Sequence, residues 1–166
     1  NTTVHKYAAY ALERIMLVRD GNNALHFTSV NVPVARLLPR LISAFDADPK
    51  AQTSPYIIKA IMRVVAVIDA NTARSAAEIA TKLASMVEGV VKGAADASHV
   101  HFLFETICLL VKKTSGLVDG GIDKPLFPLL ETILAQDLTD LIPYALQITG
   151  LLLSECSARN APTDAY

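Results

Sequence analysis

The sequence predicts an all-α fold in which helix pairs stack into a superhelix, and three observations predict it. Hydrophobic residues make up 52% of the 166 residues, which supplies apolar surface for a sizeable core. The apolar positions recur with the helical period of 3.6 residues and not with the strand period of two. One pattern of about ten residues also occurs four times along the chain. A repeated amphipathic helix indicates an array of stacked units.

The repeated pattern begins at an aromatic residue. Its four starts lie 49, 46 and 42 residues apart, at Tyr7, Tyr56, Phe102 and Tyr144. When the aromatic residue is counted as position zero, positions 1, 2, 8 and 9 are apolar in all four segments. These offsets fall on one broad face of a helix. We therefore expect four equivalent helices, each with position zero on its packing stripe.

Three further apolar-periodic stretches alternate with the repeated helices, over residues 32–45, 73–91 and 122–134. Turn signals separate the helical stretches. DGNN (20–23) comes before the first of the three, and DGG (119–121) comes before the last. We expect prolines 39 and 128 to lie inside these helices and bend them. The alternation predicts that each stretch is the first helix of a pair whose second helix is a repeated segment.

The predicted organisation is a lone helix followed by helix pairs, about three and a half pairs in all. A pair of roughly 40 to 47 residues is typical of HEAT and armadillo units, so the fold class predicted is a HEAT-like α-α superhelix. The lone helix is then the second helix of a truncated repeat, which suggests a segment of a longer protein. The predicted boundaries are 4–19 for the lone helix and 29–70, 72–115 and 120–158 for the pairs.

Composition argues against several classes of function. Fifteen basic and sixteen acidic residues give a net charge of -1, whereas a nucleic-acid-binding protein carries a basic surface. No run of 18 apolar residues occurs, so we expect no membrane partner. We also expect no cofactor, because the chain has no phosphate-binding glycine loop.

Candidate reactive side chains have plainer explanations. Cys108 and Cys156 lie in apolar helical stretches, which favours packed, inert thiols over a nucleophile. His99 and His101 are two residues apart and point to different sides of a helix, so they cannot share a metal ion. We expect capping or surface roles for both histidines. The sequence therefore predicts a protein that is not an enzyme and has no metal site.

The remaining candidates lie off the apolar stripe of the repeated helices. They occupy positions 3 and 7 and comprise Lys59, Arg63, Glu105 and Gln147. Stacking would align these residues along one wall of the solenoid. One interpretation is a solvated face with weak ion pairs between helices, such as Lys59 with Glu105. The other is a partner-binding inner wall.

Four blocks carry a resemblance to a known family. They are YAAYALER (7–14), YIIKAIMR (56–63), FETICL (104–109) and LIPYALQ (141–147). In the same order and at similar spacing, they resemble segments of the exportins of the importin-beta/karyopherin superfamily. The resemblance covers nearly all of residues 4–156.

The resemblance implies a function as well as a HEAT-repeat fold. It implies a receptor that shuttles between nucleus and cytoplasm and carries importin-alpha out of the nucleus together with Ran in its GTP form. It also implies that the second helix of each pair lines the inner, partner-facing wall. Two alternatives stay open, namely a HEAT-repeat scaffold and an import receptor that does not export importin-alpha.

Overall fold

The computed structural model describes residues 1–93, 95–114 and 121–158, with side chains described as far as residue 155. The described residues form helices joined by loops, with a single isolated β-bridge between Arg19 and Leu25. The predicted all-α class is therefore confirmed. The helices are α1 (Thr2–Met16), α2 (Val34–Asp46), the 3-10 turn η1 (Ala51–Thr53), α3 (Tyr56–Val65), α4 (Ala70–Ala73), α5 (Ala76–Lys92), α6 (Ala97–Thr114), α7 (Asp123–Ala135) and α8 (Ile142–Ala158).

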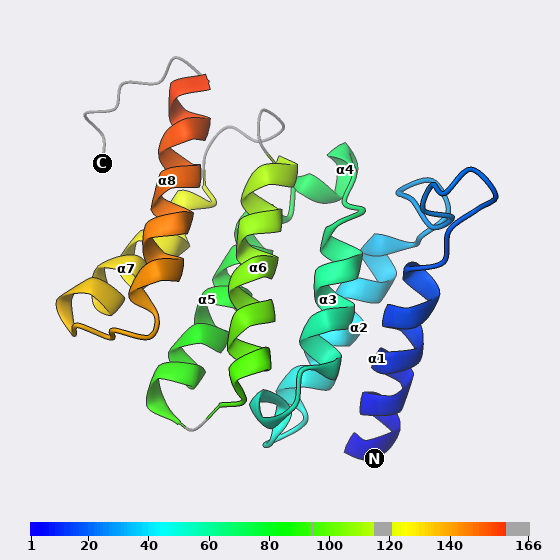
Figure 1. The fold of residues 1–166 in the computed structure, drawn as a ribbon, viewed down its shortest axis with the longest axis horizontal. Helices are drawn as coiled ribbons and strands as arrows, with labels where there is room; N and C mark the ends of the chain where they lie inside the picture. Colours follow the sequence, from blue (N-terminus) through cyan, green and yellow to red (C-terminus); the bar gives the residue numbers. More distant parts are fainter. Residues whose placement is uncertain (94, 115–120, 159–166) are drawn as a thin grey trace.

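The long helices form two layers (Figure 1). Helices α1, α3, α6 and α8 stand side by side in one layer, and α2, α5 and α7 lie behind them. Within the first layer α3 packs on α1 and α6, and α6 packs on α8. Between the layers α2 packs on α3, α5 on α6 and α7 on α8. This is the arrangement of stacked helix pairs in a HEAT-like solenoid.

All four repeated segments lie in the first layer, so the aromatic repeat in the sequence marks its second helices. We call this layer the second-helix wall. Pro39 lies inside α2 and Pro128 inside α7, as expected. Both prolines therefore fall in the first helices of pairs, on the opposite side of the solenoid. No described helix is long and apolar enough to cross a membrane.

The connection between α1 and α2 is long but locally ordered. The Asp20 carboxylate accepts hydrogen bonds from the backbone N–H groups of Asn22 and Ala24, at 2.9 and 3.0 Å. Asn23 adopts a φ of 63°, which asparagine tolerates better than most residues because its side chain is short and polar. The predicted turn at 20–23 thus reverses the chain and brings Arg19 opposite Leu25.

The core is centred on α3, which is covered by α1, α2 and α6. Seven of its ten residues are buried. The other three are Tyr56, Lys59 and Arg63, whose spacing places them on one helix face. That face belongs to the second-helix wall, so α3 meets the solvent only where a partner-facing wall is expected.

A charge placed in this core tests the stacking. Ile61 is fully buried in α3, and Ile61→Asp would bury a carboxylate without a partner. We expect the free energy of unfolding to fall by more than about 4 kcal/mol, measured by urea denaturation followed by circular dichroism. Ile15→Asp is the matched control, because Ile15 is exposed on α1, and it should cost about 1 kcal/mol or less. Equal effects of the two variants would contradict the stacked core.

Candidate partner-binding wall

The structure brings the four predicted site residues onto the second-helix wall. Lys59 and Arg63 come from α3, Glu105 from α6 and Gln147 from α8. Gln147 is exposed, whereas the other three are half-buried. Lys59 and Arg63 contact neighbouring repeats, and these contacts decide how free the two side chains are to bind a partner.

The aromatic residues at position zero join each repeat to the one before it. The Tyr56 ring meets the Tyr10 ring edge-on, with centroids 5.6 Å apart. The Phe102 ring lies under the Lys59 ammonium, whose Nζ is 4.4 Å from the ring centroid. The Tyr144 ring stacks on Phe104 at 4.7 Å. Each contact joins neighbouring second helices, so the repeated aromatic residue forms a ladder along the wall.

This ladder corrects two expectations. Among the described residues Lys59 takes part in no ion pair, and the expected pair with Glu105 is not formed. Lys59 instead makes a cation–π contact with Phe102, one helical turn before Glu105. Position zero was also expected on the buried stripe, yet Tyr7 is 73% exposed and Tyr56 is 42% exposed. Tyr7 lies on α1, the first helix that the structure describes, and among the described residues its ring makes no contact of the kind seen for the other three.

Arg63 forms an ion pair that fixes α1 to α3. Its Nη2 lies 3.5 Å from Oε1 of Glu13, whose side chain is only 10% exposed. Arg63 itself keeps 33% of its side chain exposed. A carboxylate this deep needs a cation beside it. The first role of Arg63 is therefore structural, although a third of its side chain remains exposed.

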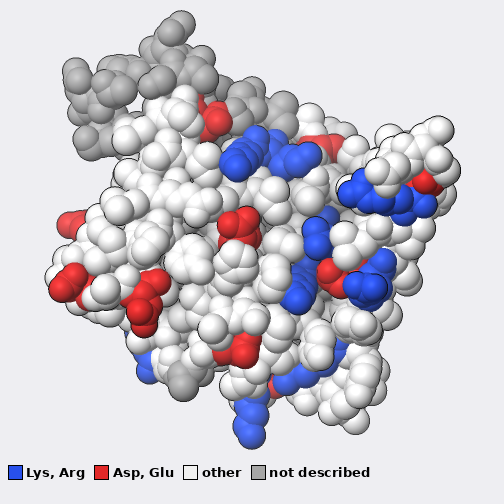
Figure 2. Space-filling model, viewed as in Figure 1, with Lys and Arg blue, Asp and Glu red and all other residues white. Residues whose placement is uncertain are grey.

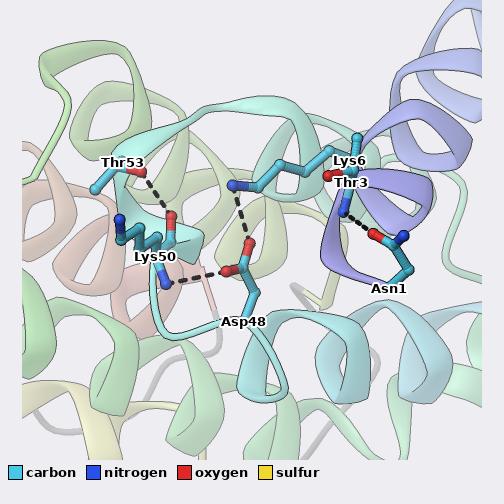
Figure 3. Close-up of polar contacts among 6 residues, drawn as sticks. All are labelled: Asn1, Thr3, Lys6, Asp48, Lys50 and Thr53. Atoms are coloured by element: carbon cyan, nitrogen blue, oxygen red, sulfur yellow. Dashed lines mark hydrogen bonds and ion pairs between the residues drawn. The ribbon is translucent and has the colours of Figure 1, made fainter.

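A second ion pair holds the other half of α1 (Figure 3). Lys6 Nζ lies 3.0 Å from Oδ2 of Asp48, in the loop after α2, and the backbone N–H of Lys50 donates to Oδ1 at 3.0 Å. Burial alone would raise the pKa of Asp48. The Lys50 N–H and the Lys6 ammonium outweigh it and hold the pKa of this carboxyl below its usual value. Helix α1 is thus attached to its neighbours at two points, near residues 6 and 13.

With this geometry defined, similarity to known proteins decides the family. Residues 13–166 match the family model described as CAS/CSE protein, C-terminus. The chain belongs to the CAS/CSE family. It is 33% identical over 155 residues to Exportin-2 of Homo sapiens and 32% identical over 158 residues to Exportin-2 of Oreochromis niloticus. Exportin-2 of Drosophila melanogaster is 29% identical over 157 residues.

These matches include 90 to 92% of the chain but only 16% of each relative's length. They confirm the resemblance to the exportins of the karyopherin superfamily that the four sequence blocks carry. The chain therefore corresponds to a short part of each Exportin-2 relative.

The buried thiol of this CAS/CSE chain is a packing group. Cys108 lies in the core of α6, and burial, with a smaller effect of the Glu105 charge, raises its pKa to about 11. At neutral pH the thiol is therefore protonated and weakly nucleophilic. His101 is exposed on the same helix, and its Nδ1 lies 3.3 Å from the Tyr144 hydroxyl. Within the described residues, no group of three His, Cys, Asp or Glu side chains could hold a metal ion.

His99 differs from its predicted surface or capping role. It is fully buried at the start of α6, and its ring stacks on Phe45 of α2 with centroids 5.6 Å apart and planes 17° apart. The cap of α6 is supplied by Asp96, whose carboxylate accepts the His99 N–H at 3.1 Å. Burial lowers the pKa of His99, and the Ser54 backbone and the Asp96 charge oppose this only in part. His99 therefore joins two repeats as a neutral aromatic ring.

The Arg63–Glu13 pair predicts a charge-swap result. Arg63→Glu places a second carboxylate beside the buried Glu13, so we expect the free energy of unfolding to fall by about 2 kcal/mol. This is less than the about 3–5 kcal/mol for breaking a fully buried pair, because Arg63 is partly exposed. Adding Glu13→Arg should recover at least about 1 kcal/mol in urea denaturation. If the loss of unfolding free energy in the double variant equals the sum of the losses in the two single variants, residues 13 and 63 are not coupled.

His99 predicts a pH dependence of stability. A base whose pKa is lowered by folding binds more protons when unfolded, so stability rises with pH. We expect the melting temperature to be constant well above pH 6.5, the ordinary histidine pKa, and to fall as the pH drops below it. His99→Phe keeps the stacked ring and should remove this slope, while His101→Phe at the exposed position should keep it. A slope unchanged in His99→Phe would assign it to another group.

Proposed function

We propose that this chain forms part of a nuclear export receptor that carries importin-alpha from nucleus to cytoplasm in complex with GTP-bound Ran. The observation that carries the proposal is the similarity to Exportin-2 over 90% or more of the chain, combined with a solenoid architecture. The receptor shuttles between the two compartments, and hydrolysis of GTP on Ran releases the cargo. The chain itself acts by binding and not by catalysis.

The partner-facing surface is the second-helix wall. Most side chains that pack the layers together are apolar and buried, whereas the wall displays tyrosine, lysine, arginine, glutamate and glutamine side chains. Gln147 is the exposed member of the four residues proposed for partner contact. Lys59, Arg63 and Glu105 contribute their exposed portions, because Lys59 and Arg63 also hold neighbouring repeats together.

The mechanism proposed is a coupling of two binding events through the shape of the solenoid. If importin-alpha and Ran both favour the same curvature, each raises the affinity for the other. The contacts between second helices suit this mechanism. A buried core resists small rotations between repeats more strongly than ring contacts and partly exposed ion pairs do. Small rotations at each repeat add up along an array.

The test is capture of importin-alpha by the full-length protein that carries these repeats. We expect capture with Ran loaded with GTP and none with Ran loaded with GDP, measured by pull-down with purified components. Equal capture in both states would favour a HEAT-repeat scaffold, and Ran-dependent release of cargo would favour an import receptor.

The same assay tests the wall. Gln147→Arg adds a charge to an exposed wall position and should weaken capture at unchanged melting temperature. Gln136→Arg, at an exposed position after α7, is the matched control and should leave capture unchanged. Equal capture by both variants would remove Gln147 from the site.

A further inference from the structure

We infer that the junction between α2 and α5 is a hinge, at which this part of the solenoid opens and closes on its first-helix side. The inference rests on the proposed function only for the use of the motion, because a receptor that couples two partners through its curvature has to bend. It adds where the bending occurs and which contacts limit it. The structure describes helices on both sides of this junction, so its openness does not come from an end of the stack.

The first-helix layer is closely packed at one junction and open at the other. Helix α5 packs directly on α7, whereas α2 and α5 make few contacts with each other. A groove of about 810 Å³ lies between α2 and α5. The second helices of the same two repeats, α3 and α6, pack closely, and Figure 2 views the stack from this side, where atoms fill the surface between them. Two repeats that are joined firmly in one layer and loosely in the other can rotate about the firm layer.

The side chains that line the groove explain why it stays open. Val34, Leu38 and Ile79 line it and are already buried. Apart from Pro39 and Ile42, the accessible lining consists of short, polar or charged side chains, including Ala35, Ser43, Ser75, Thr81 and Ser85. Such side chains offer little apolar area whose burial would favour bringing α2 onto α5. Burial therefore selects neither a wide nor a narrow groove strongly.

Among the described residues, one ion pair spans the groove. Lys82 Nζ of α5 lies 3.2 Å from Oδ2 of Asp46 at the end of α2, and the two side chains are 51% and 52% exposed. Exposed pairs of this kind contribute about 0–1 kcal/mol. The pair therefore limits the opening of the groove but breaks at little cost.

The C-terminal ends of α2 and α5 are held together and provide the pivot. The side-chain amide of Gln52, in η1 just after α2, lies against α5 at two glycines. A methyl group at Gly89 would lie 3.4 Å from its Oε1, and one at Gly93 would lie 3.3 Å from its Nε2. The Gln52 carbonyl also accepts the N–H of Asp96, at the start of α6, at 3.0 Å. Phe45, which stacks on α6, lies at the same end of α2.

The N-terminal ends of the two helices are held less firmly. A smaller cavity of about 310 Å³ continues the groove there and shares Val34, Ala35 and Thr72 with it. Neither Pro33 nor Ser75, the N-cap residues of α2 and α5, makes a side-chain hydrogen bond to its helix. Rotation about the pivot therefore moves these ends the most.

Pulsed EPR on the 166-residue chain tests the hinge. Arg36, Glu78 and Lys124 are exposed near the N-terminal ends of α2, α5 and α7. In a Cys156→Ser background, nitroxide labels on Arg36→Cys and Glu78→Cys report the α2–α5 junction, and labels on Glu78→Cys and Lys124→Cys report the α5–α7 junction. Cys108 is buried and stays unlabelled. We expect the first distance distribution to be about twice as wide as the second, because the α2–α5 junction has fewer packing contacts.

Filling the groove should restrict the motion. Ser43→Leu and Ser85→Leu, introduced together, place apolar side chains on both helices, and their burial should hold the helices in one arrangement. We expect the 36–78 distribution to narrow about 1.5-fold and the 78–124 distribution to stay the same.

Removing the ion pair should have the opposite effect. Lys82→Ala should widen the 36–78 distribution about 1.2-fold, a small change because the pair is exposed. Lys92→Ala is the matched control and should leave the width unchanged, because the pair of Lys92 with Glu88 lies within α5. Both lysines are exposed, so both variants should melt near the temperature of the unmodified chain.

Three results would overturn the inference. The first is an equal width for the two junctions, the second is a 36–78 distribution unchanged by the two leucines, and the third is an equal effect of Lys82→Ala and Lys92→Ala. The EPR samples contain neither Ran nor importin-alpha. A wide 36–78 distribution without Ran-dependent capture would thus overturn the proposed function alone, and capture with equal widths would overturn this inference alone.

Discussion

The burial of α3 between α1, α2 and α6 is the constraint on which the rest of the structure depends. No single helix pair has enough apolar surface to offset the conformational entropy lost on folding. Helix α3 solves this problem by burying seven of its ten residues against helices from three repeats. Its burial therefore ties the stability of each repeat to that of its neighbours, and it leaves only Tyr56, Lys59 and Arg63 for the solvent-facing wall.

The solvent-facing surface of the wall adds interactions of a different kind to this apolar packing. Between neighbouring second helices it uses an edge-to-face ring pair, a cation–π contact, a stacked ring pair and a partly exposed ion pair. Each is worth little compared with the burial of a large apolar side chain. The apolar core therefore supplies most of the stability, while the surface of the wall presents polar and aromatic side chains. This division of roles is what a binding solenoid requires if partners act through its curvature.

The charged residues of the wall illustrate how structural and binding roles overlap. Lys59 and Arg63 are charged and off the apolar stripe, which would usually indicate free surface groups. The structure engages one with Phe102 and the other with Glu13. The tyrosines of α1, by contrast, have the composition of packing residues and are exposed. Tyr7 is 73% exposed and Tyr10 is 47% exposed.

The sequence alone determined the fold class and the order of the helices, because both follow from local periodicity and turn chemistry. The aromatic repeat identified the second helices, and the four blocks identified the family. The tertiary structure decided what depends on the neighbours of each side chain. It buried His99 against Phe45, paired Arg63 with Glu13 and directed Lys59 to Phe102 and not to Glu105. These partners lie 43 to 54 residues apart on different helices, and the rotation of one helix against another sets which side chains meet. A helical period fixes the face of a residue, but only packing fixes what that face meets.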